Sequence, residues 1–198
     1  MRQKRSPEDY LWTVWLLSAR TVTPQHYTLT DQLIFAFEEA TLRLESAAEA
    51  LLLKENYSPE CEKDLAALGT SIEKFKDSIG STIFMEGTKS KELMADLYSS
   101  TPAAASAKVE LGNLTVGQKF KNEPGTTAVA ELSGNLIFID PQKIGKNLQQ
   151  NMGLFFHEKL HNLTGLTDDV IQDKLGLTVD SNNSKNISDK LVKDCINK

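Results

Sequence analysis

The sequence predicts an α+β fold that is mostly helical, with a small antiparallel sheet just before the helix that carries the most informative motif. Through most of the chain, apolar residues recur at three- and four-residue spacing, which is typical of amphipathic helices. Between residues 127 and 140 this period changes, and two β-rich runs flank a turn that contains Gly134. The 198 residues, of which 40% are apolar, are enough for one domain with a real core.

The first 20 residues combine features of a secretory signal with features of a buried helix. Basic residues precede an apolar run at residues 10–17, as in a signal peptide, but Glu8 and Asp9 interrupt the pattern. The run is also far shorter than the roughly 20 residues that cross a bilayer. We therefore favour a buried N-terminal helix and predict no membrane span. Secretion or export stays open, because the segment is not a convincing signal peptide.

The first half of the chain predicts four helices, separated by residues that begin or end helices. Ser58 suits an N-cap and Pro59 the first helical position after it, whereas Gly69 and Gly80 end two of the helices. Small residues dominate the stretch 99–107, which predicts a loop. The helices are expected at residues 29–54, 61–68, 70–80 and 90–98.

The second half begins with an expected β-hairpin, in which residues 133–135 connect the runs 127–132 and 136–140. The second run is a candidate edge strand, to which an extended peptide substrate could add as a further strand. An ordinary buried hairpin explains the pattern equally well. Three helices follow, at residues 147–162, 168–175 and 188–196.

Composition excludes several classes of protein. Acidic residues outnumber basic residues 27 to 22, which argues against a nucleic-acid partner. Cys61 and Cys195 are too few for a disulfide scaffold or a four-cysteine zinc site, and the sequence leaves open whether they pair. Only three histidines occur, and two of them, His157 and His161, lie four residues apart.

These two histidines belong to the motif HExxH, which occupies residues 157–161. On a helix, positions i and i+4 lie on one face, about 5–6 Å apart, so both rings can bind one Zn²⁺ ion. Glu158 lies beside the pair, where its carboxylate can take a proton from a metal-bound water that attacks a carbonyl carbon. Composition alone gives this motif with a probability of roughly 0.3%. The alternative is two ordinary histidines on a helix.

The segment 125–173 resembles the active-site half of a zincin metallopeptidase. The motif and the residues after it, HEKLHNLTGLTD at positions 157–168, are similar to C-terminal metallopeptidase-like modules of bacterial RHS-type proteins. The resemblance implies a zincin-like metallopeptidase domain at residues 58–198. Residues 1–57 are then an N-terminal helical extension whose role the sequence does not indicate.

The third zinc ligand is expected after the motif, where the turn at Gly165 returns the chain toward the metal. The extended metzincin motif places its glycine three residues and its ligand six residues after the second histidine. Here Gly165 comes four residues after and Asp168 seven, so the frame differs by one residue. Asp168 is our first choice, Asp169 the second, and Asp173 or a distant glutamate remain alternatives. Asp168 could instead cap the helix that follows.

Together these features predict a zinc-dependent metalloendopeptidase that hydrolyses peptide bonds in a peptide or protein substrate. His157, His161 and Asp168 are its expected metal ligands, and Glu158 is its general base. The alternative is a non-catalytic zincin-like module with a structural or binding role. The sequence does not indicate the substrate sequence, the group that stabilises the oxyanion, or the oligomeric state.

Overall fold

The computed structural model describes residues 29–98, 101, 104–178 and 183–197. It divides into two compact units, residues 1–34 and 35–198, and the candidate site lies within the second. The expected N-terminal helix around residues 10–17 lies outside the described residues. Among the residues that are described, no helix is long and apolar enough to cross a membrane.

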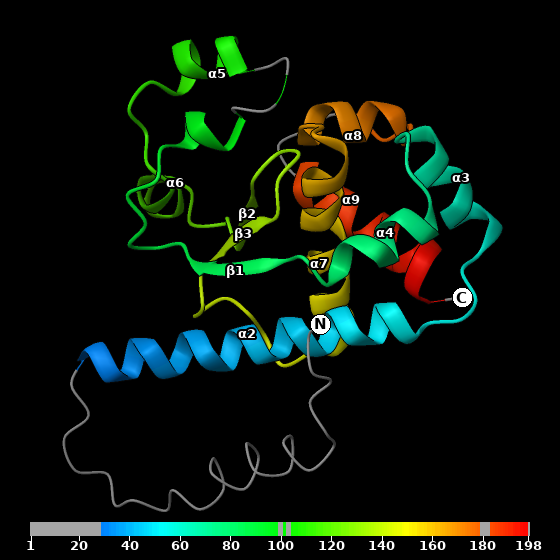
Figure 1. The fold of residues 1–198 in the computed structure, drawn as a ribbon, viewed down its shortest axis with the longest axis horizontal. Helices are drawn as coiled ribbons and strands as arrows, with labels where there is room; N and C mark the ends of the chain where they lie inside the picture. The colour runs from blue at the N-terminus through cyan, green and yellow to red at the C-terminus, as the bar shows by residue number, and fades with distance from the viewer. Residues whose placement is uncertain (1–28, 99–100, 102–103, 179–182, 198) are drawn as a thin grey trace, which may run out of the picture. The chain divides into compact units, whose positions relative to one another are not determined.

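The predicted α+β class is confirmed, since helices dominate and one small sheet is present (Figure 1). Long apolar-periodic segments form helices close to their expected bounds, because each buries one face against the rest of the unit. The α-helices are α2 (Leu29–Leu53), α3 (Pro59–Ala67), α4 (Ile72–Ile79), α5 (Ala104–Leu111), α6 (Val116–Asn122), α7 (Leu148–Thr164), α8 (Asp168–Lys174) and α9 (Asn183–Leu191). A 3₁₀ turn, η1 (Met94–Tyr98), and a π-helical turn, η2 (Val192–Ile196), complete the set.

The part of α2 from Phe35 onward belongs to the same compact unit as residues 58–198. Ala40, Leu44 and Leu51, which follow the expected three- and four-residue spacing, are at most 1% exposed and join the main core. The sequence prediction assigned residues 35–57 to the extension; the packing shows that residues 35–53 help to build the core of the domain itself.

The sheet has three strands in the order β1-β3-β2 and is mixed rather than purely antiparallel. The predicted hairpin is present as β2 (Ala128–Ala130) and β3 (Leu136–Ile139), which pair antiparallel. The third strand, β1 (Ile83–Glu86), pairs parallel with β3 and was not expected from the sequence. Its four residues follow directly after α4, and a run this short gives no clear alternation signal.

The position of β3 corrects one expectation. The run 136–140 was a candidate edge strand, but β3 lies in the centre of the sheet, with β1 and β2 on its two sides. The free edge beside the hairpin therefore belongs to β2. Central placement suits the sequence of β3, because it is apolar at every position and both of its faces are covered.

The two faces of the sheet pack against different cores. Ile137 and Ile139 point into the main core, which includes the helix α7, whereas Phe138 points into a second core with residues from η1 and α6. This alternation is the two-residue period of a strand. It places α7 against the face of the sheet that is formed by β2 and β3.

Two expectations between residues 90 and 107 are only partly met. The helix expected at 90–98 is the shorter 3₁₀ turn η1, and the loop expected at 99–107 is wrong for residues 104–107, which begin α5. Helix α6 was not expected. Its start is nonetheless local in origin, because the side chains of Thr115 and Gln118 form a capping box.

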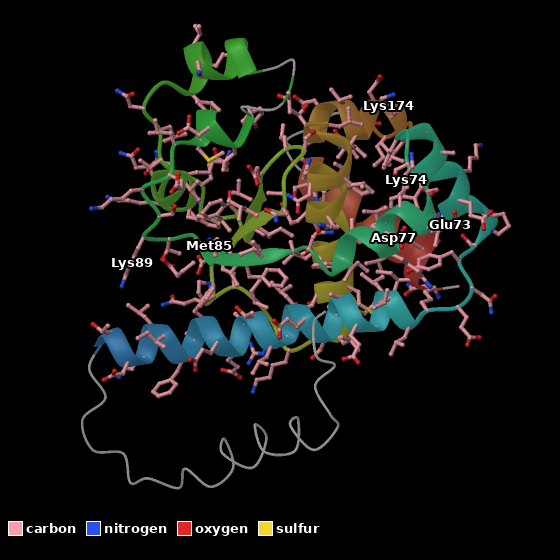
Figure 2. The ribbon with its side chains drawn as sticks, in the orientation of Figure 1. Glu73, Lys74, Asp77, Met85, Lys89 and Lys174 are labelled. Atoms are coloured by element: carbon pink, nitrogen blue, oxygen red, sulfur yellow. A yellow bond between two sulfur atoms is a disulfide. The ribbon has the colours of Figure 1, made fainter. Side chains whose placement is uncertain are left out.

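The amphipathic helix α4 illustrates how the sequence pattern becomes packing. Phe75 and Ile79 are buried, and the Phe75 ring stacks on Phe156 of α7 with centroids 4.0 Å apart. The charged residues Glu73, Lys74 and Asp77 lie on the opposite side, toward solvent (Figure 2). Ser71 caps the helix by accepting a hydrogen bond from the Lys74 backbone N–H.

The C-terminal segment is fixed to α3 by a disulfide and a charged cluster. Cys61 of α3 and Cys195 of η2 are bonded, which answers the question that the sequence left open. Beside them, the Lys190 ammonium lies 2.8 Å from Asp64 and 2.7 Å from Asp194. These contacts hold η2, and with it the preceding helix α9, against the main core.

Candidate metal centre

Helix α7 carries the HExxH motif and has clear boundaries at both ends. The Asn147 side chain accepts a hydrogen bond from the Gln150 backbone N–H at the start, and Gly165 ends the helix with φ 67°. A left-handed residue at this position favours glycine. His157 and His161 are separated by one helical turn, and both are buried, with ring centroids 4.8 Å apart. The helix and the shared face that the sequence predicted are therefore present.

Asp168, the first residue of α8, joins the two histidines. Its Oδ1 atom lies 2.8 Å from His157 Nε2 and 2.9 Å from His161 Nε2, and the two Nε2 atoms lie 3.0 Å apart. Among the described residues, these three side chains form the group whose ligand atoms could hold a metal ion. Of the alternatives considered for the third position, neither Asp169 nor Asp173 belongs to this group.

The short turn after Gly165 explains how Asp168 reaches the histidines. The chain reverses at Gly165, and Thr167 occupies the N-cap position of α8 without a side-chain capping bond. Asp168 is therefore free of the capping role that the sequence left open, and its side chain turns back toward α7.

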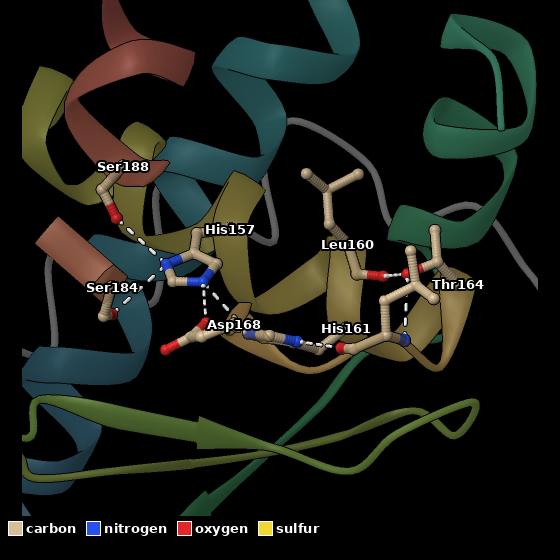
Figure 3. Close-up of polar contacts among 8 residues, drawn as sticks. His157, Leu160, His161, Thr164, Asp168, Ser184 and Ser188 are labelled. Carbon is tan, nitrogen blue, oxygen red and sulfur yellow. Dashed lines mark hydrogen bonds and ion pairs between the residues drawn. The ribbon is translucent and has the colours of Figure 1, made fainter. Parts of the chain in front are cut away.

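Outer hydrogen bonds orient both rings (Figure 3). His161 Nδ1 lies 2.6 Å from the carbonyl oxygen of Leu166, and His157 Nδ1 lies 3.1 Å from Ser188 Oγ on α9. Ser184 Oγ is 3.4 Å from the same His157 nitrogen. Such partners hold metal-binding histidines in place and fix which nitrogen faces the metal.

The Leu166 carbonyl settles the tautomer of His161, because a carbonyl oxygen can only accept a hydrogen bond. The proton of the neutral ring is thus on Nδ1, and Nε2 presents a lone pair to His157 Nε2 and to Asp168 Oδ1. A proton on His157 Nε2, or a cation bound between the three atoms, is what allows these lone pairs to converge. Ligands at zinc distances of about 2.0–2.1 Å lie about 3.3 Å apart in a tetrahedron, so the three ligand atoms, which are 2.8–3.0 Å apart, would need to separate by only a few tenths of an ångström to hold one zinc ion.

Electrostatics within the group follow from burial and proximity. Burial lowers the pKa of His161, but the hydrogen bond to Asp168 and the charge of Glu158 outweigh this effect and leave the pKa raised. Burial raises the pKa of Asp168, but its contacts with the two imidazoles outweigh that effect and hold the pKa well below its usual range. The carboxylate is therefore ionised, as a metal ligand must be.

Glu158 lies beside the group and is 5% exposed. Burial raises the pKa of its carboxyl group, while the two histidines and a hydrogen bond from the Ala130 backbone N–H act in the opposite direction. The balance favours a carboxyl group that binds a proton more readily than an exposed glutamate. Raised basicity of this kind suits a group that accepts a proton and later returns it.

Two cavities meet at this glutamate. One, of about 460 Å³, is lined by His161, Asp168 and residues of η1, α5 and β2; the other, of about 700 Å³, is lined by residues of α7, α9 and the loop before α7. Both include Thr126, Ala128, Glu158 and Ser184. Both cavities therefore border Glu158 and the beginning of β2.

The structure adds groups to the site that sequence reasoning did not find. They are the hydroxyls of Ser184 and Ser188, the Leu166 carbonyl, the Ala130 backbone N–H, and Tyr98, which lines the smaller cavity. Burial and the nearby Asp168 raise the pKa of Tyr98, so its hydroxyl keeps its proton. No local signal marks any of them, because they come from several segments of the chain and two of them, Ser184 and Ser188, share α9.

Comparison with known proteins gives no match to a family model, to a curated protein sequence or to a solved structure. The resemblance to zincin metallopeptidases therefore stays a prediction from the motif. What the structure itself provides is the geometry of the His-His-Asp group, the buried glutamate beside it and the two cavities.

Proposed function

We propose that this protein is a zinc-dependent endopeptidase. The observation that carries the proposal is the convergence of His157, His161 and Asp168 at 2.8–3.0 Å, next to the buried carboxyl group of Glu158. Three protein ligands leave one position of a tetrahedral zinc site for water or substrate, which is the arrangement of catalytic rather than structural zinc. When bound, zinc would act as a Lewis acid that polarises the substrate carbonyl and acidifies water.

The protein's own contribution to the reaction centres on Glu158. Its carboxylate accepts a proton from the attacking water molecule and then donates it to the nitrogen of the departing amine. The Ala130 backbone N–H holds this carboxylate in place, so that little reorganisation is needed between the two transfers. The Leu166 carbonyl fixes the proton of neutral His161 on Nδ1 and leaves its Nε2 available, and Ser188 holds the His157 ring through its Nδ1.

The free edge of β2 is the proposed binding site for an extended peptide. Glu131 N donates to Leu136 O, and Asp140 N donates to Thr127 O. In an antiparallel ladder such bonded positions alternate, so the backbone groups of Ala128 and Ala130 point away from β3. The Ala130 N–H meets Glu158, and the remaining groups of this edge can pair with a substrate strand.

The two cavities that border Glu158 support internal cleavage of a chain. A substrate that runs along β2 would extend into the cavity of about 460 Å³ on one side and that of about 700 Å³ on the other. The basic side chains Lys143 and Lys185, which line the larger cavity, are paired with Asp140 and Asp189. Neither lysine therefore serves as a binding group for the C-terminal carboxylate of a peptide substrate.

The test is metal analysis of the purified protein followed by the substitution Glu158→Gln. We expect one zinc per chain in both proteins, and loss of peptide hydrolysis by about 10²-fold or more in the variant. The control is Glu62→Gln, which removes an exposed carboxylate of α3 and should leave both unchanged.

Two outcomes would refute the proposal. Absence of stoichiometric zinc would remove its basis. Zinc binding without any hydrolysis that depends on Glu158 would favour the non-catalytic module, in which the same ligands serve only to bind the metal.

A further inference from the structure

Asn162, the residue directly after the motif, connects α7 to both ends of the β-hairpin turn. It is 4% exposed, and its Nδ2 atom donates to the carbonyl oxygen of Glu131 at 2.6 Å and to that of Leu136 at 3.1 Å. Glu131 directly follows β2 and Leu136 begins β3, so a single side chain holds the two strands where they separate.

The orientation of this amide indicates what it is needed for. Because both neighbours are carbonyl oxygens, the NH₂ group must face them, and the buried Asn162 Oδ1 has no hydrogen-bond partner among the residues that the structure describes. A buried acceptor without a hydrogen-bond partner is energetically costly. An apolar residue at position 162 would avoid this cost. The two hydrogen bonds that Asn162 donates are therefore what a polar residue contributes at this position.

Two further contacts join the same turn of α7 to the same hairpin. The Ser133 backbone N–H donates to the carbonyl oxygen of His161 at 3.2 Å, and the Ala130 N–H donates to the Glu158 carboxylate. Residues 158, 161 and 162 thus each bond to the β2–β3 segment. The general base, a metal ligand and Asn162 are fixed relative to one strand edge.

We propose that Asn162 is a positioning residue that sets the register of the open β2 edge relative to the His-His-Asp group. The inference rests on the proposed function, because the register of β2 affects cleavage only when a peptide substrate pairs with this edge. Main-chain bonds to β2 fix which residue of that peptide lies opposite Ala130. The contacts of Asn162 then decide which of its carbonyl groups reaches the metal and Glu158.

The register has a distinctive consequence for cleavage. Strand pairing repeats every two residues, so a substrate that slips along a displaced edge keeps its hydrogen bonds only when it moves by two residues. Loss of the positioning contact should therefore add cleavage two residues from the original bond. A displacement of about 1 Å at the reacting atoms also lowers kcat by up to about 10²-fold.

The experiment compares wild type with Asn162→Leu, which keeps a similar volume but donates no hydrogen bond. A peptide of ten residues or so that the zinc-loaded wild type cuts at one bond is incubated with each protein, and the products are identified by mass spectrometry. Zinc affinity is measured by chelator competition, and exchange of the backbone amides by hydrogen–deuterium exchange. Tyr57→Phe is the control, because it removes a hydrogen bond to the Leu51 carbonyl, outside the site.

We expect Asn162→Leu to cut at additional bonds displaced by two residues, with lower kcat and zinc affinity within about threefold of wild type. Exchange should accelerate at residues 128–139 but not across α7. If Asn162→Leu cleaves only the original bond, whether quickly or slowly, the inference is overturned. Unchanged exchange of the hairpin amides would overturn it as well. If the wild type cuts no peptide, the proposed function fails, and the exchange measurement still decides whether Asn162 fixes the edge to the helix.

Discussion

Lys159, within the motif, is a buried cation whose removal should stabilise the protein. Its side chain is only 1% exposed, and burial lowers the pKa of the ammonium group from 10.5 to about 8. One pKa unit corresponds to 1.36 kcal/mol, so holding this lysine charged in the fold costs about 3 kcal/mol near pH 7. Lys159→Met, which has a similar length without the charge, should raise the free energy of unfolding by about that amount.

The pH dependence provides the sharper test. Because the folded-state pKa is lower than the unfolded-state pKa, the penalty is complete below about pH 8 and disappears above about 10.5. The advantage of Lys159→Met, measured by guanidinium denaturation, should therefore fall from about 3 kcal/mol at pH 7 to about 1 kcal/mol at pH 10. Lys63→Met, on the exposed face of α3, should have little effect at either pH. A gain for Lys159→Met that is independent of pH, or no gain, would refute the reasoning.

Two other predictions concern the metal ligands and the disulfide. Asp168→Ala should lower zinc affinity by more than about 100-fold, since loss of an outer-shell partner alone costs about 10–100-fold. Asp169→Ala should leave zinc affinity nearly unchanged. Chelator competition measures both affinities, and the opposite order would indicate that Asp169 is the ligand. Reduction of the Cys61–Cys195 disulfide, whose cysteines are 134 residues apart, should lower the free energy of unfolding by about 5 kcal/mol. Equal denaturation midpoints with and without dithiothreitol would contradict this.

Much of the fold could be predicted because its signals are local. The apolar period of α2 and α7, the Ser58–Pro59 start of α3 and the glycine-containing turn of the hairpin all lie within a few consecutive residues. Elements without such a signal were missed or misplaced. Strand β1 has four residues and forms because β3 offers a free edge, and α5 begins in a stretch whose small residues indicated a loop.

The candidate site shows the same division. The shared helical face of His157 and His161, with Glu158 beside it, could be predicted, because the HExxH spacing places these residues on one helix by geometry alone. Asp168 was one of several options, and the turn at Gly165 was needed to select it. Ser188 could not be predicted, because it lies 31 residues from His157 and reaches the ring only through the packing of α9 on α7.

The sequence by itself thus determined the α+β class and the motif helix with its two histidines on one face, since these depend on spacing along one element. Tertiary structure decided which carboxylate completes the His-His-Asp group, that β2 rather than β3 offers the free edge, and that Cys61 and Cys195 pair. The physical reason is that these outcomes depend on contacts between segments distant in the chain. Such contacts are fixed by burial of the shared core, and no local pattern encodes them.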